Sequence, residues 1–188
     1  LDVLTLYLSE SEVAALVSSA TDGVGEDDLQ LPEQHVALDL VPAGPEAMLR
    51  QLLYGGFPDH PGRAETLAHE VFASHPEDAP EIMPGVVFFH GHVDVEEPMT
   101  FVGVCPPGAS LPGTASPARV VLALLAPRAM PPEAYLQTLA VVAQLVRSEA
   151  TVEALLEVET TEAARDLLLD GLRADRPEEA AHAATEDE

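Results

Sequence analysis

The sequence predicts an α/β fold in which a mixed β-sheet is flanked by helices, and three features support this prediction. Segments 85–89, 101–105 and 120–125 are rich in the branched and aromatic residues that favour strands. After Pro131 the apolar residues recur with the period of a helix. Strands and helices do not alternate regularly along the chain, so a mixed sheet is expected rather than a purely parallel one.

Both ends of the 188-residue chain are predicted to lie outside the main domain. The apolar segment 1–8 is typical of a strand, and a capping box after it predicts a short helix. A glycine-containing acidic linker follows, so residues 1–31 are interpreted as an N-terminal extension and residues 32–173 as the domain. Residues 174–188 contain no large apolar residue, which predicts a disordered acidic tail.

The first half of the domain is predicted to contain one strand and two helices. Segment 35–41 alternates like a strand, and Gly44-Pro45 opens a helix that Gly55-Gly56 ends. A second helix is predicted over 62–73. The prolines that follow predict irregular chain until the next strand; they are Pro76, Pro80 and Pro84.

The C-terminal part of the domain is predicted to be helical. The long helix after Pro131 carries Tyr135 on its apolar stripe. Shorter helices are expected over 149–158 and 161–172, the second with Thr160 or Thr161 as its cap.

Charge and composition exclude several classes of protein. Eight Arg, no Lys and 33 acidic residues give a net charge of -25, which repels a phosphate backbone, so nucleic acid is not expected as a partner. The apolar runs are too short to span a bilayer, and the first residues lack a secretory signal. The single Cys105, between strand-forming residues, predicts a buried side chain and a reducing compartment. We therefore expect a cytoplasmic protein without direct membrane insertion, and no motif predicts a cofactor.

The densest cluster of chemically active residues lies in the segment PGVVFFHGHVDVEEP. An apolar strand is predicted to end at His90-Gly91-His92, where side chains reach solvent or a cleft. A neutral imidazole nitrogen is nucleophilic near pH 7 and can accept a phosphoryl group, which makes His90 a candidate phosphoacceptor. The alternative is a histidine that is merely hydrogen-bonded at a strand end. The acidic residues that follow are interpreted as a solvated charge run.

A metal site is a second interpretation of the same segment. His90, His92 and Asp94 alternate, and alternate residues of a strand can converge on one ion. This alternative requires the strand to continue through Gly91, whereas a turn at Gly91 would separate the two histidines.

The stretch from about Gln34 to Leu172 resembles the EIIA domain of the fructose and mannitol type of bacterial sugar phosphotransferase systems. The similarity rests on Gly85-Val86-Val87-Phe88-Phe89-His90-Gly91, on VVLALLAP, and on the long helix PPEAYLQTLAVVAQLV with two helices after it. The resemblance implies a mixed sheet flanked by helices. It also implies that His90 receives phosphate from a small phosphocarrier protein and passes it to a sugar permease component.

Three departures from the family pattern bear on function. Phe88-Phe89 replaces the Ile-Pro pair, His69-Glu70 stands where the family has Arg-Glu, and Tyr135-Leu136 replaces a His-Leu or His-Ile pair. The resemblance thus implies three site positions, His90, Tyr135 and His69. His92 is a fourth candidate, because its imidazole could compensate for the lost positive charge. Because a guanidinium and an imidazolium are lost, we expect a regulatory domain of a bacterial transport system, tethered to a membrane transporter. The alternative is an active phosphocarrier in which His92 supplies the missing positive charge.

Overall fold

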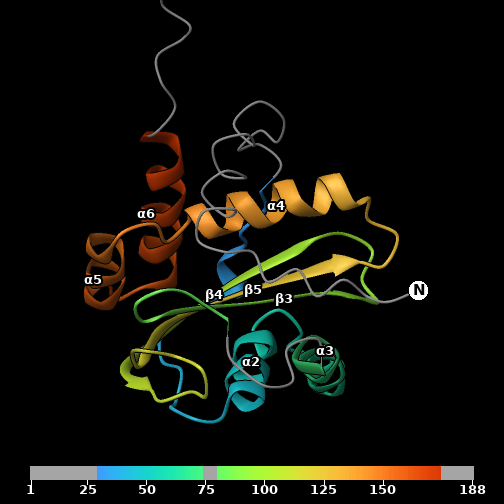
Figure 1. Cartoon of the computed structure of the whole chain (residues 1–188), viewed down its shortest axis with the longest axis horizontal. Coiled ribbons are helices and arrows are strands. Elements are labelled where there is room, and N and C mark those ends of the chain that lie inside the picture. The colour runs from blue at the N-terminus through green and yellow to red at the C-terminus, as the bar shows by residue number, and fades with distance from the viewer. Residues whose placement is uncertain (1–28, 74–79, 175–188) are drawn as a thin grey trace, which may run out of the picture.

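The computed structural model describes residues 29–73 and 80–174. The expectations for the extension before residue 29 and for the tail after residue 174 lie outside these residues. Figure 1 shows one sheet with helices on both of its faces. None of the helices within the described ranges combines the length and the hydropathy that crossing a membrane requires.

The sheet is mixed, as the sequence predicts, and within residues 29–73 and 80–174 it has five strands in the order β1-β4-β5-β3-β2. β3 runs parallel to β5, and β1 runs parallel to β4, whereas β4–β5 and β2–β3 are antiparallel pairs. The central strand β5 is buried along nearly its whole length, which explains its continuous apolar sequence. The strands are β1 (Val36–Ala37), β2 (Glu81–Met83), β3 (Val86–Val93), β4 (Met99–Ala109) and β5 (Ala118–Pro127).

Helices cover the two faces in two groups, each with its own core (Figure 1). α2 and α3 pack on one face, over a cluster that includes Phe89, Phe101 and Cys105. α4, α5 and α6 pack on the other, over a cluster that includes Phe88 and Leu122. Cys105 is fully buried, which confirms that prediction. The helices are α2 (Pro45–Tyr54), α3 (Pro61–Ala73), α4 (Pro132–Gln144), α5 (Glu149–Glu157) and α6 (Thr161–Ala174), preceded by the 3-10 turn η3 (Glu33–His35).

The helices begin where the sequence predicts. Pro45 occupies the first turn of α2, and α4 likewise begins with a proline in its first turn. The Ser148 side chain accepts a hydrogen bond from the Thr151 backbone N–H and caps α5. Thr160, one of the two candidate caps, accepts from the backbone N–H of Ala163 at 3.2 Å at the start of α6.

Three predicted segments differ from the structure. β1 is only two residues long, although Leu40 N–H still donates to the Val104 carbonyl at 2.9 Å. The segment predicted to be irregular before residue 85 contains β2, because Pro80 and Pro84 flank this strand rather than interrupt it. β3 does not end at His90 but continues to Val93, with Gly91 paired in register opposite Leu125 of β5.

Candidate functional site

The continuation of β3 decides how its two histidines are placed. His90 pairs with Leu124 and His92 with Ala126, so there is no turn at Gly91. Successive side chains on a strand alternate between faces, so His90 and His92 lie on the same face as Phe88, beneath α4. The strand therefore presents two imidazoles in a row to one helix.

Tyr135 on α4 brings these two imidazoles into one cluster. α4 begins at Pro132, and Tyr135 lies in its first turn, facing the sheet. The Tyr135 hydroxyl is hydrogen-bonded to Nδ1 of His90 at 2.8 Å. The His92 ring lies against the Tyr135 ring with centroids 4.2 Å apart, while the Phe88 ring meets His90 edge-on at 5.5 Å. Three of the four predicted site residues, His90, His92 and Tyr135, are thus in direct contact.

The Tyr135 hydroxyl is a neutral partner. Burial raises the pKa of Tyr135 to about 12, so the phenol keeps its proton at neutral pH. A phenol can donate or accept a hydrogen bond, and which role it takes depends on the His90 tautomer. If Nδ1 carries the proton and donates it to Tyr135, then Nε2 holds the lone pair that a nucleophile needs. The contact is therefore compatible with nucleophilic chemistry at Nε2, but it adds no positive charge.

His69, the fourth predicted residue, lies elsewhere. α3 packs on the sheet face opposite α4, and the His69 side chain is 73% exposed. Its Nδ1 lies 3.1 Å from Glu46 Oε1 of α2. The neighbouring Glu70 accepts a hydrogen bond from Arg128 at 3.1 Å. The structure does not bring His69 into the His90 cluster, so a role for it in phosphoryl transfer stays a prediction.

The acidic run after β3 points to solvent. Asp94, Glu96 and Glu97 are exposed, as expected of a solvated charge run. The backbone carbonyl of Asp94 accepts a hydrogen bond from Arg63 at 2.9 Å. Within the part of the chain that the structure describes, no three His, Cys, Asp or Glu side chains gather closely enough to hold a metal ion. The alternative of a metal site at His90, His92 and Asp94 therefore has no geometric support.

His35 is a feature that the sequence does not reveal. Its sequence context, at the start of a predicted strand, predicts an ordinary surface or turn histidine. His35 does lie in the η3 turn, but its side chain is buried rather than at the surface. Its side chain is only 7% exposed, its Nδ1 lies 3.1 Å from the Thr100 carbonyl, and its ring stacks on Phe101 with centroids 4.1 Å apart. No local pattern could have indicated this, because Thr100 is 65 positions away in the sequence.

The buried His35 predicts a pH dependence of stability. Desolvation lowers its pKa from the ordinary value of 6.5, against a smaller opposing effect of the Thr100 hydrogen bond. Below pH 6.5 the unfolded chain binds a proton at this residue before the folded chain does, so the free energy of unfolding falls as the pH drops toward the lower, folded pKa. Urea denaturation should show a steeper decline for the wild type than for His35→Gln, which keeps a donor for the Thr100 carbonyl. Identical pH profiles would contradict this assignment.

Comparisons with known proteins identify the fold. No family model matches the chain, and no curated protein matches it. Solved structures do match. Those described below are all IIA proteins, so the chain has an EIIA-like fold.

Three of these structures overlap with the chain to a similar extent. The nitrogen regulatory protein IIA-Ntr from Neisseria meningitidis is 16% identical, with a TM-score of 0.60 over 76% of this chain and 97% of that one. IIA mannitol from Escherichia coli is 16% identical, with a TM-score of 0.59 over 74% and 99%. Enzyme IIA mannitol from Escherichia coli, in a complex with phosphorylated enzyme IIB mannitol, is 15% identical, with a TM-score of 0.59 over 75% and 98%. The predicted mixed-sheet, EIIA-like fold is confirmed.

Proposed function

We propose that this chain is a cytoplasmic EIIA-like domain with a regulatory role in a bacterial transport system. Its role is to bind a protein partner, either a phosphocarrier protein or a membrane transporter domain to which it is tethered. One observation supports regulation over phosphoryl turnover: the position next to His90 that the resemblance assigns to a second histidine holds Tyr135, whose neutral hydroxyl is hydrogen-bonded to His90 at 2.8 Å.

The electrostatics of the cluster support this choice. A phosphoryl group on an imidazole carries about two negative charges, and fixed cations stabilise such a group far better than one neutral donor does. Tyr135 supplies one neutral hydrogen bond. Arg63 and Arg128, which lie near the end of the sheet where β3 and β5 finish, donate to the Asp94 carbonyl and to Glu70. A net charge of -25 further opposes the approach of a phosphorylated donor.

Phosphotransfer with a matched pair of proteins tests the proposal. The chain is mixed with phosphoenolpyruvate and the general phosphotransfer proteins, with IIA mannitol as the positive control. We expect little or no acid-labile phosphate on the wild type. Tyr135→His, which restores an imidazole beside His90, should increase the label, and the double variant Tyr135→His with His90→Ala should lose it. A stoichiometric label on the wild type that His90→Ala removes would overturn the regulatory assignment.

The contact between His92 and Tyr135 favours one alternative, an active phosphocarrier. In that case Nε2 of His90 attacks the phosphorus of a donor phosphohistidine, so that one P–N bond forms as the donor's P–N bond breaks. The His92 ring would then supply the positive charge that stabilises the arriving dianion. This alternative requires His92→Gln to reduce phosphorylation strongly. His60→Gln, at an exposed position before α3, should leave it unchanged.

A further inference from the structure

The ring of His35 is held in one orientation. Because a carbonyl oxygen can only accept a hydrogen bond, the contact with Thr100 places the proton on Nδ1. The Phe101 ring covers one side of the imidazole, with the two planes 23° apart. Gly56 leaves the space for this stack, because a Cβ atom there would lie 3.2 Å from His35 Cδ2 and closer still to the Phe101 ring. The hydrogen bond to Thr100 and the stack on Phe101 therefore fix the His35 tautomer that has its lone pair on Nε2.

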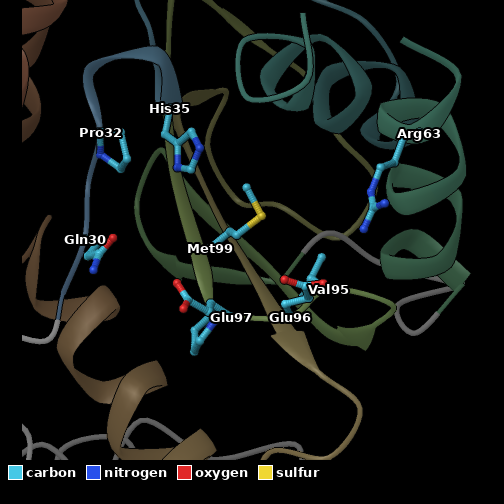
Figure 2. A pocket seen from close by; sticks show the side chains of 9 residues that line it. Gln30, Pro32, His35, Arg63, Val95, Glu96, Glu97 and Met99 are labelled. Atoms are coloured by element: carbon cyan, nitrogen blue, oxygen red, sulfur yellow. The ribbon is translucent and has the colours of Figure 1, made fainter. Parts of the chain in front are cut away.

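Nε2 of His35 has no hydrogen-bond partner within the described residues. More than nine in ten buried polar groups in proteins are hydrogen-bonded, and leaving an acceptor unpaired in the interior costs free energy. His35 lines a hollow of about 440 Å³. Figure 2 shows its ring pointing toward the other side chains that line this hollow. A ligand in the hollow can therefore supply the missing donor.

The walls of the hollow define the chemistry of that ligand (Figure 2). Glu96 and Glu97 offer acceptors, Arg63 offers donors, and Gln30 offers both. Two carboxylates against one guanidinium disfavour an anion, and within the described residues no three His, Cys, Asp or Glu side chains gather there to hold a metal ion. Met99 gives an apolar surface for C–H groups. Hydroxyl groups both donate and accept, so an uncharged ligand with several hydroxyls can pair with all of these groups.

We propose that this hollow binds an uncharged polyhydroxylated molecule, a sugar or a polyol, with one ligand hydroxyl donating to Nε2 of His35. The volume lies within the range of small-molecule sites, roughly 300–1,000 Å³. The hollow is lined by Arg63 of α3, by the turn between β3 and β4 and by the segment before β1, and its lining does not include His90, His92 or Tyr135. The EIIA-like domain would thus have a small-molecule site whose occupancy does not depend on phosphoryl transfer.

Imidazole NMR gives a direct test, with D-mannitol and D-glucose as neutral probes and glucose 6-phosphate as the anionic one. The ¹⁵N spectrum of the unliganded chain should show His35 as the Nδ1–H tautomer. A neutral probe should shift the His35 signals saturably, with a millimolar or tighter dissociation constant. His35→Phe keeps an aromatic ring on Phe101 but removes the acceptor, so binding followed by calorimetry should disappear. Glu97→Gln, an exposed change that leaves folding intact, should weaken binding about three- to tenfold.

The control is His60→Gln, which lies outside the hollow and should bind like the wild type. The proposal is overturned if neither neutral probe shifts the His35 signals, if binding survives both His35→Phe and Glu97→Gln, or if only the phosphorylated probe binds. No phosphotransfer protein enters this experiment, so its outcome is independent of the phosphorylation test.

Discussion

Replacing Phe101 by Ala is expected to lower the free energy of unfolding by about 3–5 kcal/mol. Phe101 is fully buried in the core beneath α2 and α3. Its ring also stacks on His35 at 4.1 Å and on Phe57 at 6.4 Å, so truncation opens a cavity and removes two ring contacts at once. Urea denaturation monitored by circular dichroism measures the loss.

Phe57→Ala is the matched control for this variant. Phe57 belongs to the same stack but is only partly buried, so its truncation leaves a smaller cavity. We expect a loss of less than half that of Phe101→Ala. Equal losses for the two variants would show that the stack, rather than burial of Phe101, provides the stability.

The second large effect is expected for Gly55→Ala. Although Gly55 is exposed, this replacement should lower the free energy of unfolding by about 1–3 kcal/mol. Gly55 follows α2 with φ -60, a conformation that alanine adopts easily, so the backbone angle is not the cause. A Cβ atom would instead overlap the carbonyl oxygen of Gln34. This oxygen belongs to the backbone and cannot turn aside, so α2 would have to move away from the η3 turn that carries His35.

Gly171→Ala provides a contrast in the opposite direction. Gly171 lies within α6, and a Cβ atom there meets nothing within 4 Å. Alanine should therefore stabilise the chain by about 0.5–1 kcal/mol, because glycine is a poor helix former. Thermal unfolding should shift upward for Gly171→Ala and downward for Gly55→Ala. Shifts of the same sign would contradict the steric argument.

Most of the fold can be predicted from the sequence because its signals are local. Proline in the first turn marks α2 and α4, and the apolar segment 120–125 marks the central strand. The prediction is wrong where the same local pattern is compatible with two structures. Pro80 and Pro84 can interrupt a strand or flank one, and here they flank β2, with Glu81 accepting from the backbone N–H of Gly85 at 3.0 Å.

The candidate site could be predicted only in part. The family resemblance points to His90 and Tyr135, and the spacing of the two histidines points to His92. The register of β3 beneath α4 explains why the three meet. The same resemblance pointed to His69, which the structure pairs with Glu46. The hollow beside His35 could not be predicted, because its walls come from the segment before β1, the start of α3 and the turn before β4.

His90 and His35, which lie on opposite faces of the sheet, are connected through paired residues of three neighbouring strands. His90 pairs with Leu124, Leu124 pairs with Thr100, and the Thr100 carbonyl anchors His35. With neighbouring strands about 4.8 Å apart, the row spans roughly 10 Å of rigid backbone. In a sample with isotope-labelled histidines, His35 and His90 therefore report on opposite faces of the sheet. A structural change that crosses the sheet should shift the signals of both, whereas a local change should shift only one.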